Sequence, residues 1–263
     1  MCAFDKERIE KLIKSGHFIP GIHNYCDRWC ERCLFTTRCL SCELSEDHFD
    51  SPESKDINNR EFWDKLHEVF SETLQMVKEH AKEMGLGLDD TDYEELERQK
   101  QQIDAEAQNH PCAKAAKEYA AMAGDQLEAS GHLFEEKQNQ LQSSVEMELP
   151  DSDPSGESRD ISDAVEVIQW YQHFIYVKLI RALHGLLRSG ADDFERDDAN
   201  GSAKVALEAI NRSICAWGRL LEHFPQQEEE LLSILVHLQR LRLTTENAFP
   251  DARAFIRPGL DEQ

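Results

Sequence analysis

Five of the eight cysteines in this chain lie within the seventeen residues from Cys26 to Cys42. Cys30, Cys33 and Cys39 lie between these two. The whole segment from Cys26 to Cys42 is polar and contains several arginines. Core cysteines behave as small apolar side chains, so packing gives no reason for them to gather in a polar loop. Two cysteines separated by two residues can direct both sulfur atoms to one centre, and the intervening amides can donate to those sulfurs. The spacing predicts a site that binds a metal through thiolates.

Two kinds of centre fit the spacing. Cys30-x2-Cys33-x5-Cys39-x2-Cys42 contains two Cys-x2-Cys pairs and could hold zinc tetrahedrally, although its five-residue gap is shorter than in ordinary zinc ribbons. An iron–sulfur cluster also takes four thiolates. A role of the thiols in redox chemistry without any metal is a third alternative.

The motif Cys30-x2-Cys33-x5-Cys39 resembles part of a motif in a known family. It is similar to the iron–sulfur cluster loop of the endonuclease III and adenine glycosylase family, whose pattern is C-x6-C-x2-C-x5-C. The three cysteines match the last three ligands of that pattern, whereas its first ligand falls on His23. Cys26 offers a thiolate four residues before Cys30. The resemblance covers about 17 residues and implies a 4Fe–4S cluster loop, with a fourth ligand that stays open among Cys26, Cys42 and His23.

The charge of the chain argues against DNA repair and against nucleic-acid binding in general. The formal net charge of the 263 residues is −23, and phosphate contacts need clustered Lys and Arg. Residues 1–42 carry seven Lys or Arg against five Asp or Glu, so the cysteine segment is about +2 and the remainder about −25. Cationic side chains beside the cysteines favour thiolates. We expect a protein partner or a small molecule, with no nucleic acid and no membrane.

Apolar residues repeat at helical spacing through most of the chain. The pattern predicts helices over 59–84, 91–107, 111–141, 161–187, 202–224 and 227–247, and a short amphipathic helix over 1–15. Residues 43–58 and 190–201 are polar and predict a loop and an acidic turn, with Ser202 as a helix N-cap and Cys215 on an apolar core face. Because no β-alternation occurs, the fold class is all-α: a bundle of about five to six helices with an N-terminal cysteine-rich metal-binding loop.

Composition also suggests the organisation of the chain. We expect an N-terminal helix and cysteine loop over 1–57, a helical bundle over 58–249 with a flexible linker at about 143–160, and a C-terminal tail over 250–263. No apolar segment is long enough to cross a membrane, and crowded thiols suit a reducing compartment, so we expect a cytoplasmic protein.

The sequence identifies no reaction, because it contains no phosphate-binding glycine loop, no G-x-S-x-G elbow and no H-E-x-x-H pair. The pattern favours a metal-binding or 4Fe–4S-cluster-binding helical protein that serves as a binding or regulatory module. The alternative is a redox enzyme or electron-transfer component that uses the cluster.

Overall fold

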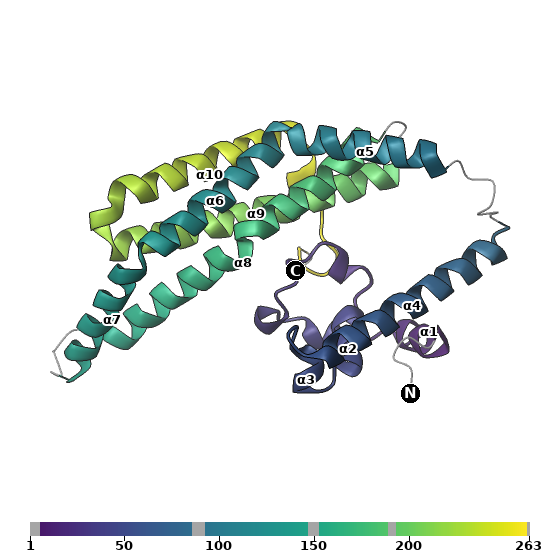
Figure 1. Ribbon diagram of the computed structural model, residues 1–263, viewed down its shortest axis with the longest axis horizontal. Helices are drawn as coiled ribbons and strands as arrows, with labels where there is room; N and C mark the ends of the chain where they lie inside the picture. The colour runs from purple at the N-terminus through teal and green to yellow at the C-terminus, as the bar shows by residue number, and fades with distance from the viewer. Residues whose placement is uncertain (1–5, 86–92, 147–152, 189–192, 262–263) are drawn as a thin grey trace. The chain divides into compact units, whose positions relative to one another are not determined.

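The computed structural model describes residues 6–85, 93–146, 153–188 and 193–261, and these residues form helices, turns and connecting loops (Figure 1). The predicted all-α class is therefore confirmed. The described residues contain ten α-helices where the sequence predicts five to six: α1 (Lys6–Lys14), α2 (Leu40–His48), α3 (Pro52–Lys55), α4 (Arg60–Glu83), α5 (Tyr93–Asn109), α6 (Pro111–Ala129), α7 (Gly131–Glu146), α8 (Pro154–Leu187), α9 (Asp193–His223) and α10 (Glu228–Ala248).

The chain divides into two compact units. Unit 1 comprises Met1–Arg98 together with Ile256–Gln263, and unit 2 comprises Gln99–Phe255. The last residues of the chain therefore belong to the same unit as the cysteine loop. The predicted domain boundaries after residues 57 and 249 stay a prediction, because compactness alone does not define an independently folding domain.

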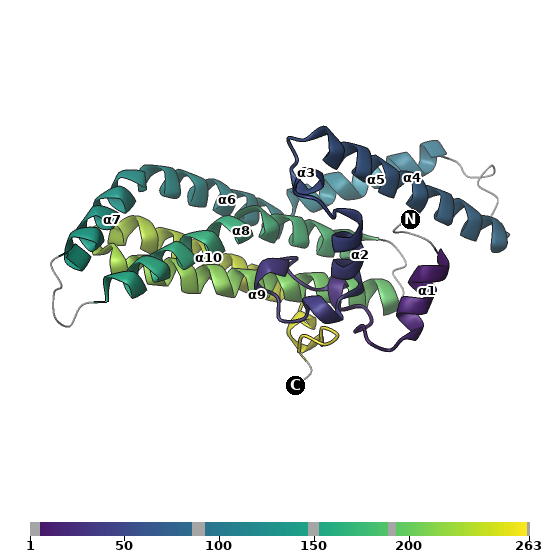
Figure 2. The same ribbon diagram turned by 90° about the horizontal axis from the view of Figure 1, so that it is seen from below.

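Unit 2 is built around a four-helix bundle of α6, α8, α9 and α10. Each of these helices packs against two others of the set, and both ribbon views show them running alongside each other (Figures 1 and 2). Side-chain contacts with backbone carbonyls join neighbours: Gln172 Nε2 on α8 donates to Ala120 O on α6 at 2.7 Å, and His237 Nε2 on α10 lies 2.8 Å from Ala115 O. The bundle is the part of the fold that the apolar periodicity predicts.

The core of unit 2 contains large aromatic side chains whose polar atoms form hydrogen bonds with one another. Trp217 on α9 is fully buried, and its indole N–H donates to the hydroxyl of Tyr119 on α6 at 3.2 Å. The apolar residues over 161–187 lie around most of a helix, which predicts a central core helix. In the structure α8 buries one face only: Ile168, Ile175 and Leu179 are buried whereas Val177 is 58% exposed. It is one wall of the bundle, not a central helix.

Several predicted boundaries are wrong for physical reasons. The polar residues 43–58 include α2 and α3; α3 begins at Pro52, after Ser51 whose side chain accepts from the Ser54 amide in a capping box. The predicted helix over 111–141 is two helices, because Ser130 ends α6. Its hydroxyl bonds to Gln126 O and to the side chain of Gln227.

Two stretches expected to be irregular are helical. The predicted linker at 143–160 is helical at 143–146 and 154–160, and its residues 147–152 lie outside the described part of the chain. The predicted acidic turn at 190–201 is helical from Asp193, and Ser202 is buried inside α9 and not an N-cap. Small buried residues around it, Ala199 and Ala203, permit close helix packing, so tertiary contacts override the polar composition.

Unit 1 has little apolar core. Among the described residues of this unit, Ile22 is the one apolar side chain that is less than a tenth exposed. Polar contacts connect its elements: His48 Nε2 at the end of α2 lies 2.9 Å from Lys65 O, and Lys65 Nζ donates to His48 O at 2.6 Å. This unit positions the cysteines.

Candidate metal centre

The cysteine loop consists of three single 3₁₀ turns, η1 (Ile22–Asn24), η2 (Cys30–Arg32) and η3 (Thr36–Arg38), followed by α2. Cys30 opens η2, and Cys33 closes that turn by donating its backbone N–H to Cys30 O at 3.1 Å. Cys39 closes η3 in the same way, with an N–H bond of 3.2 Å to Thr36 O, and directly precedes α2. Cys42 lies in the first turn of α2. Local turns therefore fix the spacing of four of the five cysteines.

Arg28 shapes the segment between Cys26 and Cys30. Its φ of 60° lies in the left-handed region, which is the only positive φ of a non-glycine residue in the described chain and costs about 1–2 kcal/mol for such a residue. Its guanidinium donates to Ser41 Oγ at 3.1 Å. This bond ties the Cys26–Cys30 turn to the helix that carries Cys42.

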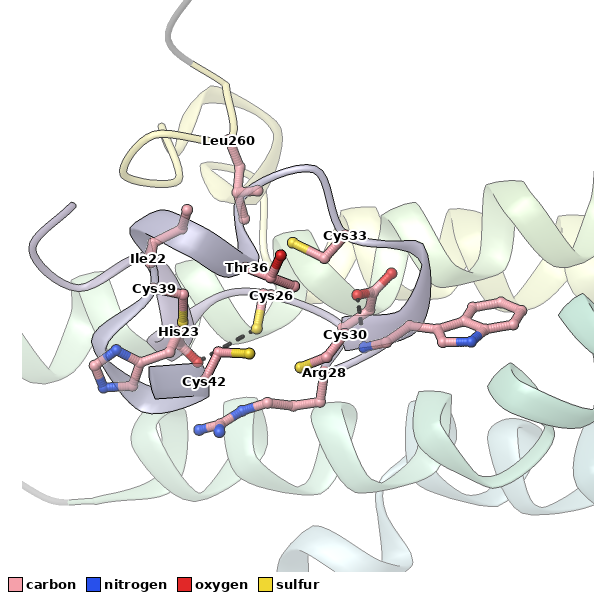
Figure 3. Close-up of a pocket in the computed structure, with 12 residues that line it drawn as sticks. Ile22, His23, Cys26, Arg28, Cys30, Cys33, Thr36, Cys39, Cys42 and Leu260 are labelled. Carbon is pink, nitrogen blue, oxygen red and sulfur yellow. Dashed lines mark hydrogen bonds between the residues drawn. The ribbon is translucent and has the colours of Figure 1, made fainter. Parts of the chain in front are cut away.

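All five predicted cysteine ligands, with His23, line a single pocket (Figure 3). The sulfur atoms of Cys26, Cys30 and Cys42 lie near one another on one side of the loop, whereas the imidazole of His23 points away from them (Figure 3). Apolar side chains complete the wall, among them Ile22, Trp29 and Leu260. The structure thus brings together the residues that the sequence singles out.

The thiols of this pocket disfavour one another's ionisation. Burial, followed by the charges of Cys42, Cys26 and Cys39, raises the pKa of Cys30 to about 11 from its ordinary 9.0. Burial and then Cys39 raise the pKa of Cys42, with Cys33 also contributing. Several thiolates can share this space only if a cation offsets their mutual repulsion.

Hydrogen bonds at the sulfur atoms have the pattern expected of a ligand loop. The Phe35 amide, two residues after Cys33, donates to Cys33 Sγ at 3.4 Å, as backbone amides often do to ligand sulfurs. The Cys26 thiol donates to His23 O at 3.6 Å. Burial, with a smaller effect of Arg28, lowers the pKa of His23, which favours the neutral imidazole that a metal ligand requires.

The C-terminal segment covers part of the pocket, which the sequence does not predict. Leu260 lines the pocket, more than two hundred residues away from the cysteines in the chain. Gly259, with a φ of 69°, packs so closely that a Cβ atom there would lie 2.7 Å from Ile19 Cγ2. Arg257 and Asp261 close the segment with an ion pair of 2.7 Å. The one sequence signal is the Pro258-Gly259 pair, which indicates a turn but not its partner.

Within the described residues, no group of three or more His, Cys, Asp or Glu side chains has the arrangement that holds a metal ion. The remaining cysteines lie elsewhere: Cys2 is outside the described residues, Cys112 is buried in α6, and Cys215 is exposed on α9. The prediction that Cys215 lies in the core is wrong, because the buried face of α9 passes through Ser213, Trp217 and Leu220 instead.

Comparisons with known proteins do not extend this description: no family model, no curated protein and no solved structure matches the chain. Among the described helices, none combines the length and the apolar character needed to cross a membrane.

Proposed function

We propose that this chain binds a metal centre through the cysteine pocket of unit 1 and serves as a binding or regulatory module. The observation that carries the proposal is the meeting of five thiols in one pocket of a unit whose described residues bury Ile22 alone among apolar side chains. Small units without a sufficient core depend on metals or disulfides for stability. The cysteines are free thiols, so a bound cation is the cross-link that their chemistry supports.

A 4Fe–4S cluster is the first candidate. Cys30, Cys33 and Cys39 supply three thiolates, and Cys26, whose charge acts on Cys30, supplies the fourth. Trp29, Ile22 and Leu260 would limit the access of water, which protects a cluster from oxidation and tunes its potential.

Zinc is the second candidate, and the position of Cys42 favours it. Cys42 and Cys30 are hydrogen-bonded through their side chains, so the set Cys30, Cys33, Cys39 and Cys42 also lies within one pocket. A four-thiolate zinc site is structural and closed, and it would fix the loop in one shape.

The role of the centre depends on whether it is zinc or an iron–sulfur cluster, and on whether the cluster accepts an electron. A zinc site or a redox-inactive cluster would hold Arg28 and the loop in a fixed shape for a partner protein or a small molecule. A cluster that accepts an electron would make the chain a redox enzyme or an electron-transfer component, which is the alternative function. In either case thiolates persist best in a reducing compartment such as the cytoplasm.

The test is anaerobic purification with metal analysis and visible absorbance. Cys30→Ser, Cys33→Ser and Cys39→Ser should each abolish stoichiometric metal, because these residues belong to both ligand sets. Loss of metal in Cys26→Ser but not in Cys42→Ser supports the cluster, and the reverse supports zinc. Cys215→Ser is the matched control, since this thiol is exposed on α9 in the other unit. Full metal content in Cys33→Ser would show that the ligand assignment is wrong.

A reversible reduction of the iron-loaded protein separates the two functions. An electrochemical wave that disappears in Cys30→Ser supports the electron-transfer role. A centre without such a wave supports the binding module.

A further inference from the structure

Helix α4 exposes an apolar stripe that has no part in the metal centre. Trp63, Phe70, Val77 and Met84 recur every seven residues, and Leu74 lies between the second and the third of them. Their exposed fractions range from 56% for Trp63 to 62% for Met84. Residues at alternating spacings of three and four share one face of a helix, so these side chains form one stripe along α4 and its C-cap residue Met84.

The opposite face of α4 makes the contacts within unit 1. Phe62 packs against Phe49 with ring centroids 5.7 Å apart, and Lys65 Nζ donates to Asp50 Oδ1 at 2.5 Å. Trp63 also contacts unit 1, since its indole N–H donates to Ile57 O at 2.8 Å. Its side chain is still 56% exposed, so the stripe presents a second apolar face besides the one that anchors the helix. A soluble protein rarely leaves such a contiguous apolar patch open unless it is an interaction site.

The stripe follows a coiled-coil heptad. Trp63, Phe70, Val77 and Met84 occupy successive d positions, and His67, Leu74 and Ala81 occupy the a positions between them. A repeat of this kind over three heptads is typical of a helix that packs lengthwise against another helix. The partner surface is thus an apolar helix of similar length.

We propose that the partner is a second copy of this chain, with the two α4 helices packed antiparallel. In that arrangement the a position of one copy shares a layer with the d position of the other. Trp63 then lies opposite Ala81 of the second copy, and Phe70 lies opposite Leu74 of the second copy. A large side chain meets a small one at the ends of the stripe, whereas a parallel pair in register would place Trp63 against Trp63 and Ala81 against Ala81.

Charge also favours the antiparallel orientation. Asp64 and Lys78 both occupy e positions, and in an antiparallel pair the e positions of the two helices flank the same side of the seam. Each Asp64 lies opposite Lys78 of the second copy, so the two-fold symmetry provides two ion pairs. In a parallel pair, e positions face g positions, and there Lys78 would face Thr73. Asp64 forms an ion pair with Arg60 on the same helix at 3.4 Å, but its side chain is 67% exposed, so its carboxylate can also face Lys78 of the second copy.

The area of the stripe suits a dimer of moderate affinity. An aromatic side chain such as Trp63 or Phe70 presents on the order of 150–250 Å², and Leu, Val and Met somewhat less. Each of the five stripe residues is more than half exposed. Roughly 100 Å² from each, with the flanking residues, gives about 1,000–1,200 Å² for the pair, which is at the lower end of specific interfaces. We therefore expect a dissociation constant in the micromolar range and not an obligate dimer.

Sedimentation equilibrium of the full chain, over about 1–200 µM, tests the association. The expected result is a reversible monomer–dimer equilibrium, which Leu74→Glu weakens at least about tenfold because a buried unpaired carboxylate replaces an apolar contact. The matched control is Gln75→Glu, which adds the same charge one residue away and off the stripe. Far-UV circular dichroism checks that both variants keep their helicity. A chain that stays monomeric throughout this range overturns the proposal, and so does equal dimerisation of Leu74→Glu and the unaltered protein.

A charge exchange tests the orientation. Asp64→Lys and Lys78→Asp alone should each weaken the dimer roughly three- to tenfold, since each converts two ion pairs into like-charge pairs. An equimolar mixture of the two variants should restore the affinity as a heterodimer, and the double variant D64K/K78D should restore it as a homodimer. If neither combination restores it, the antiparallel arrangement is wrong.

Discussion

The two units of this protein differ in what holds them together. Unit 2 buries a nearly continuous set of apolar side chains along α6, α8, α9 and α10, with Trp217 and Tyr119 at its centre. The described residues of unit 1 bury Ile22, together with the polar residues His48 and Ser54. Its elements are joined by ion pairs and hydrogen bonds, such as Arg8 with Asp47 and Lys65 with Asp50. Exposed pairs of this kind contribute about 0–1 kcal/mol each, so they cannot replace a core.

This difference is consistent with the proposed metal centre in unit 1. A bundle with periodic apolar faces gains its stability from burial and needs no cross-link. The cysteine loop of unit 1 consists of single turns and a short helix, gains little from burial, and would benefit most from a metal that fixes several turns at once. Ile22, the one buried apolar side chain among the described residues of unit 1, lies at the cysteine pocket itself.

The largest expected effect is that of metal removal. Chelation or oxidation of the proposed centre should remove the protection of backbone amides in residues 20–42 and leave unit 2 unchanged, because only unit 1 depends on the cross-link. Hydrogen exchange read by mass spectrometry resolves the two units, and far-UV circular dichroism should retain most of its helical signal. A loss of protection in α8 and α9 on chelation would show that unit 2 also depends on the metal.

The sequence predicts unit 2 better than unit 1, because burial of apolar side chains decides the structure of unit 2. Where burial decides the structure, the apolar period is visible: the helices over 161–187 and 227–247 correspond to α8 and α10, although α8 starts earlier, at Pro154. The apolar period does not reveal a helix where small buried residues form the contacts between helices. Ala199 lies in the acidic stretch 190–201 that predicts a turn, and Ser202 lies where an N-cap is predicted. Both are buried inside α9, whose small side chains pack closely against neighbouring helices.

In unit 1 the cysteine spacing predicts which residues meet, and the pocket brings these thiols together. The sequence could not predict that Leu260 joins them, because a contact between the two ends of the chain has no local pattern. It also could not predict which face of α4 would be open. The repeat of Trp63, Phe70, Val77 and Met84 is typical of a buried face, yet the structure exposes all four.

Two glycine substitutions should have opposite effects in the two units. Gly259→Ala should destabilise unit 1 by roughly 1–2 kcal/mol, because alanine resists the left-handed conformation and its Cβ would press on Ile19. Gly218→Ala should stabilise unit 2 by about 0.5–1 kcal/mol, since this glycine lies within α9 and a Cβ there meets nothing within 4 Å.

Urea unfolding followed separately for each unit by hydrogen exchange measures both effects. Gly259→Ala should also speed the extraction of metal by a chelator, because Leu260 covers the pocket. An unchanged extraction rate would mean that the C-terminal segment does not shield the centre.

The smallest expected effect is a pH dependence whose sign depends on the metal. The pKa of Cys30 is raised to about 11 in the folded metal-free protein, above its ordinary 9.0. The thiol of Cys30 therefore keeps its proton to higher pH in the folded state than in the unfolded state, and the stability of metal-free unit 1 should fall as pH rises from about 9 toward 11.

In the metal-loaded protein the thiolates are ligands and binding releases protons, so metal affinity should rise with pH until the thiols are ionised. Exchange protection of residues 20–42, measured at several pH values with and without metal, gives both slopes. In metal-free Cys30→Ser, the decline of unit 1 stability with pH should be much smaller. If the decline keeps its full slope in this variant, the titrating group is not Cys30.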